Sequence, residues 1–307
     1  MDAEVAGNIG PPVLQVFEER LRSGKPPKAW VLELSSYQLE TTWSLAPTAA
    51  AMLNLSEDHF DRYANLDEYG AAKARIFMGA RLQVLNRDDP RSLAMAEPGR
   101  EVVTFGLDAP KAEKDFGVAD GHLVHGRKRI LPVDELPIRG AHNVANALAA
   151  SALANVIGIG ADETSHGLKT FKGLPHRVEL VATRRGVEWY DDSKGTNVGA
   201  TVAALRGLGK KTVLILGGEG KGQDFSPLRD PVREFAVQVL LIGRDAALIQ
   251  KVVGGERCHS LEDAVERAAH IPAQAVLLSP ACASFDMFRD YRHRGEVFAA
   301  AVKALAP

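Results

Sequence analysis

The sequence predicts an α/β protein with two domains, each built on a β-sheet with helices packed around it. Short apolar runs alternate with helical patterns along most of the chain, as in open sheets with helical crossovers. Several of these runs end in a polar turn that leads directly into a helical pattern, as residues 187–201 (VEWYDDSKGTNVGAT) do. A Gly-Leu-Pro turn at residues 173–175 interrupts the alternation. We therefore expect domains of residues 1–173 and 174–307.

The first domain is expected to contain a mixed sheet. The run at residues 29–34 (AWVLEL) is almost continuously apolar, which is typical of a parallel strand covered on both faces. Gly117, Gly121 and Gly126 mark turns in a stretch that alternates like hairpins. The expected strands are residues 29–34, 48–55, 82–86 and 101–106, with hairpins over 114–136, and the expected helices are residues 12–23, 66–78, 140–156 and 161–171.

The second domain is expected to contain a mostly parallel sheet, because the strand and helix patterns alternate again after residue 175. A long helix is expected to close the chain, and residues 279–284 are expected to lead into it. The expected strands are residues 178–183, 187–190, 212–216, 237–242 and 275–278, and the final helix is residues 284–305.

Composition excludes several classes of protein. The chain has 307 residues, of which 46% are hydrophobic and 25% charged, and a formal net charge of −2. This balance gives no basic surface for nucleic acid. Two cysteines are too few for a disulfide framework and suit a reducing compartment. No apolar run is long enough to cross a membrane, and residues 1–12 (MDAEVAGNIGPP) lack the pattern of a secretory signal. We expect a soluble, cytoplasmic protein.

Residues 191–197 (DDSKGTN) form the most informative stretch of the chain. Asp191 and Asp192 stand at the end of a strand, and Ser193, Thr196 and Asn197 are candidate caps of the following helix. In open α/β sheets, ligands bind at the carboxyl ends of strands, and the free N–H groups of a helix start favour anions. A capped turn with solvated charges remains the alternative interpretation.

Three residues of the first domain are candidates for metal chemistry. Glu33 lies near the end of an apolar strand, where a carboxylate is costly to bury unless it is paired or binds a metal. His59 lies in an acidic loop, and oxygen ligands with one imidazole suit Mg²⁺ or Mn²⁺. Lys73 interrupts the apolar stripe of its helix, and a desolvated lysine can react as a neutral amine. A solvated Glu33, an acidic surface loop and a snorkelling Lys73 are the alternatives.

Two loops of the second domain carry further candidates. The glycine-rich run at residues 217–222 (GGEGKG) follows a strand and allows the backbone to approach a ligand closely, with Lys221 reaching it. A tight turn is the alternative interpretation. The run is not a phosphate-binding P-loop, because no G-x-x-x-x-G-K-[ST] occurs in this sequence. Residues 279–284 (SPACAS) suggest another anion site, and we exclude hydrolase chemistry because no nucleophile elbow is present.

Together these segments resemble the Mur ligases, the ATP-dependent amide ligases of peptidoglycan precursor synthesis, and most closely the D-glutamate-adding branch of that family. The matching segments follow the family's order over essentially the whole chain. They are GNIG (7–10), LELSSYQLE (32–40), NLSEDHFDRY (54–63), AAKARIF (71–77), GAHNVANALAA (140–150), GLPHRVE (173–179), DDSKGTN (191–197), GGEGKGQDFSPL (217–228) and SPACASFDMF (279–288).

The resemblance implies a role for each candidate residue. It implies an ATPase-like central domain that binds ATP and Mg²⁺, and a Rossmann-like, doubly wound C-terminal domain that binds the amino acid. One Mg²⁺ would be held by Glu33, and a second by His59 and Lys73, the latter carbamylated by CO₂. The nucleotide would be contacted by Asn143, Asn146, Arg177 and Asp192, and the nucleotide-sugar substrate by Asn8 and Ser35. D-Glutamate would be received by Lys194, Thr196, Lys221, Ser284, Phe285 and Tyr291.

The reaction implied by the resemblance joins D-glutamate to UDP-N-acetylmuramoyl-L-alanine. The γ-phosphate of ATP would pass to the L-alanine carboxylate, and the amine of D-glutamate would attack the resulting acyl phosphate. The expected partners are these small molecules, with no nucleic acid and no membrane, and the protein is expected to be a monomer. A hinge at residues 173–175 would allow domain closure over ATP.

The sequence departs from the family pattern in one respect. The N-terminal UDP-binding domain and the P-loop of the family are not found in it, so we expect residues 1–307 alone to bind ATP poorly and to show low activity. D-Glutamate-dependent ADP release is then expected only once the upstream segment is supplied. Two alternatives stay open, namely a fragment that only binds ligand, and a sibling Mur or folylpolyglutamate-type ligase that adds another amino acid.

Overall fold

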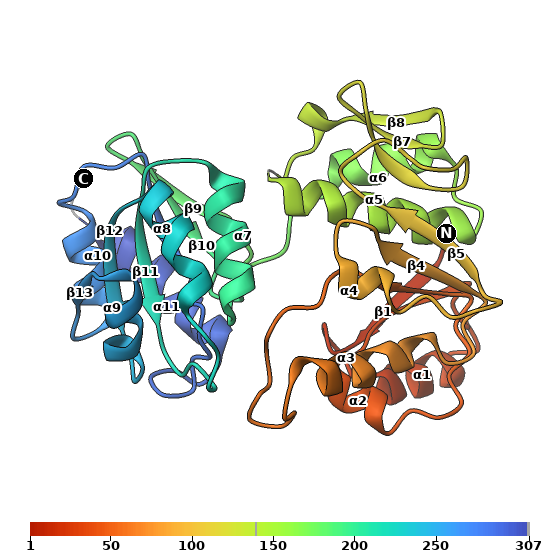
Figure 1. Ribbon diagram of the computed structural model, residues 1–307, viewed down its shortest axis with the longest axis horizontal. Helices are drawn as coiled ribbons and strands as arrows, with labels where there is room; N and C mark the ends of the chain where they lie inside the picture. Colours follow the sequence, from red (N-terminus) through yellow and green to blue (C-terminus); the bar gives the residue numbers. More distant parts are fainter. Residues whose placement is uncertain (139, 306–307) are drawn as a thin grey trace. The chain divides into compact units, whose positions relative to one another are not determined.

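The computed structural model describes residues 1–138 and 140–305. They form two compact units, which we call the first unit (residues 1–55 and 67–103) and the second unit (residues 56–66 and 104–305). Helices and strands alternate in both units, so the predicted α/β class is confirmed (Figure 1).

The first unit contains two pairs of parallel strands, in which β1 pairs with β2 and β3 pairs with β4. Helix α3 starts at the boundary with the second unit, and β5 runs across that boundary. The elements are β1 (Ala3–Gly7), α1 (Val13–Arg22), β2 (Ala29–Glu33), α2 (Ser36–Glu40), β3 (Ala49–Met52), α3 (Leu66–Ala74), the 3₁₀ helix η1 (Arg75–Phe77), β4 (Leu82–Asn86), α4 (Pro90–Leu93) and β5 (Glu101–Phe105).

Strand β2 confirms the predicted strand but not its predicted burial. Val31 is 51% exposed and the other residues of β2 are only half-buried. Among the described residues β2 has one strand neighbour, β1, so it is an edge strand of a two-stranded sheet. The sequence pattern missed β1 itself, because Ala-Glu-Val-Ala-Gly is poor in the β-branched and aromatic residues that mark strands.

The helix predicted over residues 66–78 also differs in detail. Its regular part ends at Ala74, and the chain continues as the 3₁₀ helix η1. Phe77, which lies in the tighter turn, is fully buried, whereas Lys73 in the regular part is half-buried.

In the second unit, three antiparallel strands confirm the predicted hairpins. Gly121 and Gly126 take positive φ angles of 71° and 54° at the turns that join these strands. Gly117 lies within β6, so the turn predicted there is wrong. The elements of this part are β6 (Phe116–Ala119), β7 (His122–His125), β8 (Lys128–Pro132), the 3₁₀ helix η2 (Val133–Glu135), α5 (Ala141–Val156) and α6 (Ala161–Thr170).

The remainder of the second unit is built on a six-stranded sheet with the order β13-β12-β11-β14-β10-β9. All neighbours pair in parallel except β9, which is antiparallel to β10 at one edge. The elements are β9 (Glu179–Arg184), β10 (Val187–Asp191), α7 (Val198–Leu208), β11 (Thr212–Gly217), the 3₁₀ helix η3 (Ser226–Leu228), α8 (Arg229–Phe235), β12 (Ala236–Ile242), α9 (Ala246–Val253), β13 (Glu256–Arg257), α10 (Leu261–Ala268), β14 (Ala275–Leu278) and α11 (Tyr291–Ala304).

Helices cover both faces of this sheet, as predicted for a doubly wound fold. Every residue of β11 is buried, and successive side chains point to opposite faces. Leu214 and Leu216 pack in the core formed with α7, α8 and α9, whereas Val213 and Ile215 pack in the core formed with α10 and α11. The central strands therefore carry continuous apolar runs because both of their faces are covered.

The final helix is shorter than predicted and begins at Tyr291. The Asp290 side chain accepts a hydrogen bond from the backbone N of His293 and caps it. Residues 279–284 do not lead into the helix, because Ala281 has a positive φ of 58° and Ala283 pairs with Glu219 as an isolated antiparallel bridge. The prediction that SPACAS opens the final helix is wrong.

Candidate functional site

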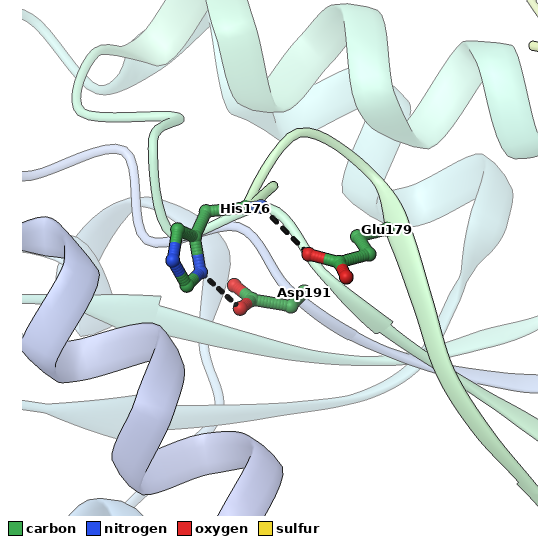
Figure 2. A group of neighbouring side chains, drawn as sticks. All are labelled: His176, Glu179 and Asp191. Atoms are coloured by element: carbon green, nitrogen blue, oxygen red, sulfur yellow. Dashed lines mark hydrogen bonds and ion pairs between the residues drawn. The ribbon is translucent and has the colours of Figure 1, made fainter. Parts of the chain in front are cut away.

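Strand β10 delivers two carboxylates into the interior of the second unit. Asp191 is 1% exposed, and its Oδ2 accepts a hydrogen bond from Nδ1 of His176 at 2.7 Å (Figure 2). Its Oδ1 accepts from the backbone N of Ser193 at 2.8 Å. Burial raises the pKa of Asp191, and the His176 and Ser193 hydrogen bonds only partly offset this. The pair holds the segment before β9 against the end of β10.

Asp192, the predicted nucleotide contact, is also buried. Its Oδ2 accepts a hydrogen bond from Oγ of Ser279 at 2.6 Å, and its Oδ1 accepts from the backbone N of Val178 at 3.3 Å. Burial raises the pKa of Asp192 to about 7, although the Ser279 hydrogen bond and the charge of Arg177 favour the ionised form. The side chain therefore titrates near neutral pH, which is unusual for an aspartate.

His176, Glu179 and Asp191 have the residue types of a metal site, and one ligand atom from each lies within 4.8 Å of the others (Figure 2). One polar atom of each residue is, however, already hydrogen-bonded within the protein. Nδ1 of His176 contacts Asp191, and the Glu179 side chain accepts from the backbone N of His176 at 2.9 Å. These contacts fit a structural role, in which they stabilise the backbone of His176 at its strained positive φ of 63°.

The turn after β10 positions two of the residues predicted to receive D-glutamate. Nζ of Lys194 lies 4.3 Å from the centroid of the Tyr291 ring, a cation–π contact that orients the ammonium group. The backbone N of Lys194 donates to the carbonyl of His176, and the backbone N of Thr196 donates to the carbonyl of Lys194. The structure thus brings Lys194 and Tyr291 together and places Thr196 in the same turn.

Asn197 ends this turn and is the N-cap of α7. Its Oδ1 accepts a hydrogen bond from the backbone N of Ala200 at 2.9 Å. Of the three candidate caps proposed from the sequence, Asn197 is the one that caps the helix. The Ser193 hydroxyl instead donates to the carbonyl of Tyr291 at 2.7 Å.

Lys221 lies in the loop after β11, with a positive φ of 52° between two glycines. Its Nζ contacts Oδ1 of Asp58 at 3.0 Å, and Nδ2 of Asn197 donates to the other oxygen of Asp58 at 3.2 Å. Burial alone would raise the pKa of Asp58, but the charges of Lys221 and His59 outweigh it and hold the pKa below its ordinary value. Lys221 is therefore paired in this structure.

Ser284 and Phe285 lie in the loop that precedes α11. Ser284 is buried, and its carbonyl accepts hydrogen bonds from the backbone N atoms of Met287 and Phe288. Phe285 is 71% exposed. The two neighbouring residues predicted to receive D-glutamate thus differ sharply in burial.

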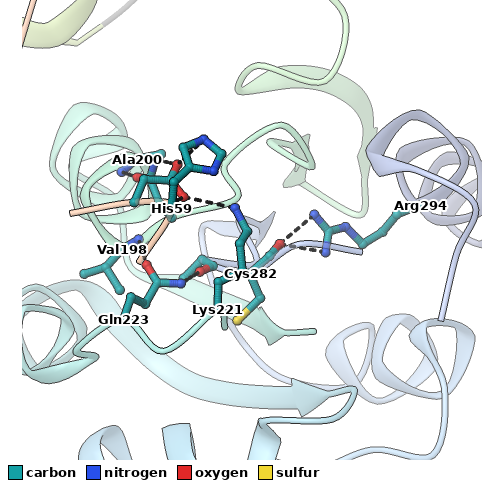
Figure 3. A network of polar contacts seen from close by, with 10 residues as sticks. His59, Val198, Ala200, Lys221, Gln223, Cys282 and Arg294 are labelled. Carbon is teal, nitrogen blue, oxygen red and sulfur yellow. Dashed lines mark hydrogen bonds and ion pairs between the residues drawn. The ribbon is translucent and has the colours of Figure 1, made fainter. Parts of the chain in front are cut away.

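Arg294 is a buried residue that sequence reasoning missed. Its guanidinium donates to both Oγ and the carbonyl of Ser193. It also donates to the carbonyl of Cys282 (Figure 3). It therefore joins the turn after β10 to the loop after β14. Burial lowers the pKa of Arg294 to about 10. Its spacing of four residues from buried Phe298 on α11 is the signal that could have revealed it.

Asn143 and Asn146 lie in the first turns of α5, where Asn143 is half-buried and Asn146 is exposed. Arg177 is exposed in the segment between Gly173 and β9. The charge of Arg177 acts on Asp192, because the guanidinium favours the ionised carboxylate and so lowers its pKa.

In the first unit, Asn8 and Glu33 meet at the ends of the paired strands β1 and β2. Nδ2 of Asn8 donates to Oε1 of Glu33 at 3.0 Å, and the backbone N of Asn8 donates to the carbonyl of Glu33 at 2.7 Å. Ser35 is the N-cap of α2 and forms a capping box with Gln38. Nζ of Lys73 lies 5.3 Å from the centroid of the Tyr69 ring.

The residues predicted to bind metal are divided between the units. Glu33 and Lys73 belong to the first unit, and His59 belongs to the second. His59 takes a positive φ of 58°, with its backbone N bonded to Oδ1 of Asp58 at 2.9 Å. Carboxylate and imidazole groups are donor types that suit Mg²⁺, and Lys73 would offer oxygen donors only if carbamylated.

Comparison with known proteins agrees with this arrangement of elements. Residues 14–154 match the Mur ligase middle domain, and residues 176–282 match the Mur ligase, glutamate ligase domain. UDP-N-acetylmuramoylalanine--D-glutamate ligase of Aromatoleum aromaticum is 54% identical, over 99% of this chain and 68% of its own length. The chain belongs to the Mur ligase family. The UDP-N-acetylmuramoylalanine--D-glutamate ligase of Thiobacillus denitrificans is 58% identical over 98% of this chain.

The chain spans 66% of the length of the Thiobacillus denitrificans relative, about two thirds. Solved structures of this family agree in fold. The MurF ligase from Thermotoga maritima, in complex with ADP, superposes with a TM-score of 0.67 at 16% identity, covering 92% of this chain and 69% of that one. Within residues 1–138 and 140–305, no helix combines the length and the apolar character needed to cross a membrane.

Proposed function

We propose that this chain carries the catalytic and amino-acid-binding parts of an ATP-dependent ligase that joins D-glutamate to UDP-N-acetylmuramoyl-L-alanine. The observation that carries the proposal is that Lys194 and Lys221 lie at the same edge of the six-stranded sheet β13-β12-β11-β14-β10-β9. They follow β10 and β11, two parallel strands on either side of β14, so both lysines lie at the carboxyl edge. Ligands of open α/β sheets bind at this edge.

The chemistry of this edge suits a dicarboxylic amino acid. Lys194 and Lys221 supply two positive charges, and the start of α7 supplies backbone N–H groups that favour an anion. Thr196 and Ser284 add hydroxyl groups that can donate to carboxylate oxygens. Phe285 and Tyr291 would complete the site, Tyr291 by holding Lys194 in place.

The activation of the acceptor falls to a second group of residues. Asn143, Asn146, Arg177 and Asp192 would bind ATP, with Arg177 providing a charge for its phosphates. Glu33 would hold one Mg²⁺, and His59 with carbamylated Lys73 would hold another, while Asn8 and Ser35 would contact the nucleotide-sugar substrate. Mg²⁺ in such a site neutralises the charge of transferring phosphoryl groups.

The chain's own contribution to the reaction is chiefly positioning. Lys194 and Lys221 orient the amino acid so that its amine faces the activated L-alanine carboxyl group, which carries the phosphate received from ATP. Attack by the amine forms the amide, and phosphate leaves. The catalytic part would be residues 1–173 and the amino-acid-binding part residues 174–307. We further propose a cytoplasmic monomer.

Titration calorimetry with D-glutamate tests the proposal directly. We expect D-glutamate to bind residues 1–307 more tightly than L-glutamate. Lys194→Met and Lys221→Met should each weaken D-glutamate binding by about tenfold, because each removes one charge-assisted contact. Lys251→Met, a matched change of an exposed lysine on α9, should leave the affinity unchanged. Unaltered D-glutamate binding in both site variants would instead favour a sibling ligase with another amino acid.

A further inference from the structure

The Lys221 ammonium group is paired with a carboxylate of the protein itself. Asp58 comes from the 56–66 segment, far from Lys221 in sequence, and its Oδ1 lies 3.0 Å from Nζ of Lys221. The two side chains are only 15% and 19% exposed. The contact is therefore largely shielded from water, where a charge pair is stronger than at the surface.

Asp58 is held where it is by several independent contacts. Besides Lys221, it accepts hydrogen bonds from Nδ2 of Asn197 and from the backbone N of His59. The segment also lies close against the start of α7, since a Cβ placed on Gly199 would come within 3.2 Å of the Ser56 side chain. A fixed carboxylate thus stands among the residues assigned to D-glutamate.

The charges of D-glutamate suggest a binding role for the carboxylate of Asp58. The free amino acid carries two carboxylates and one ammonium group at neutral pH. Lys194 and Lys221 can pair with the carboxylates, but Thr196, Ser284, Phe285 and Tyr291 offer no negative charge for the ammonium group. Burying a charged group without a partner is costly, so a site for this amino acid needs an anion. Asp58 is the anion already in contact with Lys221.

We propose that Asp58 binds the ammonium group of incoming D-glutamate. On binding, Lys221 exchanges Asp58 for a substrate carboxylate, and Asp58 exchanges Lys221 for the substrate amine. Lys221 and Asp58 are thus paired with an opposite charge both before and after the exchange, so neither is left buried alone. The inference rests on the proposed D-glutamate site and makes Asp58 a specificity residue for amino acids over simple dicarboxylates.

The test compares D-glutamate with glutarate, which has the same two carboxylates but no amine. Both are titrated by calorimetry into the wild-type chain, Asp58→Asn and Asp230→Asn. Asparagine keeps the size and the acceptor oxygen of Asp58 while removing its charge. Asp230 is a matched control, because its side chain is 78% exposed on α8.

We expect wild-type protein to bind D-glutamate at least about tenfold more tightly than glutarate, the effect of one charge-assisted hydrogen bond. Asp58→Asn should remove most of this preference by weakening D-glutamate binding about tenfold, with glutarate bound equally or more tightly. Asp230→Asn should behave like the wild type.

Three results would overturn the inference. Tighter binding of both ligands by Asp58→Asn would make Asp58 only a competitor for Lys221, and equal weakening of both would make its role structural. Equal wild-type affinities for D-glutamate and glutarate would also contradict it, and this comparison needs no variant to fold. Failure of the wild type to bind either ligand would count against the proposed D-glutamate site itself.

Discussion

Two strands of this protein end in acidic residues, yet their carboxylates lie in very different surroundings. Glu33 ends β2 in the first unit, where it is half-buried and accepts a side-chain hydrogen bond from Asn8. Asp191 ends β10 in the second unit and Asp192 follows it, and both are almost completely buried. Similar sequence patterns, an apolar run with an acid at its end, precede both sites.

The difference comes from the neighbours of each strand. Strand β10 lies between β9 and β14, and α11 packs against it through the contact of Phe298 with Trp189. Strand β2 pairs with β1. A carboxylate at a strand end is thus buried or accessible according to elements that are distant in sequence. Burial in turn sets the pKa, which is why Asp192 titrates near neutral pH.

The largest expected effect is the dependence of stability on pH that Asp192 causes. Its pKa in the folded protein, about 7, is above the ordinary value of 3.8, so the folded state binds the proton more tightly. This contribution is complete below about pH 4 and is lost as the pH rises to about 7. Asp192→Asn should remove a pH-dependent loss on the order of a few kcal/mol across that interval.

Urea unfolding followed by Trp189 fluorescence measures this, with Trp30 and Trp43 replaced by Phe so that the signal reports the second unit. Glu33→Gln is the matched carboxylate-to-amide change at the other strand, and it is followed by Trp30 and Trp43 fluorescence with Trp189 replaced by Phe, because Glu33 lies in the first unit. We expect it to alter the free energy of unfolding by about 0.5 kcal/mol or less at neutral pH. The same pH dependence in Asp192→Asn and wild type would show that Asp192 is not the residue responsible.

A second, smaller effect is expected at Gly295 on α11. A Cβ at this position would overlap Nδ1 of His176 and Oδ2 of Asp191, so Gly295→Ala must disturb their hydrogen bond. We expect destabilisation of about 1–3 kcal/mol from this overpacking. Gly167→Ala in α6, where a Cβ would meet no atom within 4 Å, should instead stabilise the protein by about 0.5–1 kcal/mol.

Thermal unfolding of the two glycine variants provides the comparison. Opposite shifts of the midpoint are expected for the same chemical change on two helices of one unit. If Gly295→Ala were as stabilising as Gly167→Ala, the close packing of α11 on the end of β10 would not matter for stability.

A smaller destabilisation than that of Gly295→Ala is expected at Ser35, near Glu33. Ser35→Ala removes the hydroxyl that caps α2, which should cost about 1 kcal/mol. Ser35→Asn should retain most of the stability, because asparagine is as good an N-cap as serine. Hydrogen exchange of the amides of α2 checks this. Equal protection in Ser35→Ala and wild type would show that the capping box does not stabilise α2.

The sequence predicted much of the fold correctly, chiefly where local patterns are strong. The five strands predicted in residues 174–307 are all present, because their apolar runs are long and turn residues bound them. Strand β13 was missed, since Glu256 and Arg257 are polar and form only a short edge pairing. The last helix was extended too far, because the pairing of Ala283 with Glu219 is invisible in a local pattern.

The same contrast holds for the candidate site. Polar turns after apolar strands stand out in the sequence, and the family resemblance then assigned Lys194, Thr196 and Lys221 in these turns to D-glutamate. Asp58 and Arg294 were not assigned to this site, because their importance lies in which partners they meet. Arg294 looks like an ordinary helix arginine until its contacts with Ser193 and Cys282 are seen.

By itself the sequence determined the α/β class, the order of the elements and the turns that carry the polar residues. These features depend on interactions between residues close in the chain, namely hydrophobic periodicity, caps and glycine turns. Only the tertiary structure decided which carboxylates are buried and that Lys221 pairs with Asp58. Burial and ion pairing depend on segments separated by up to 163 residues, and no local pattern encodes such distances.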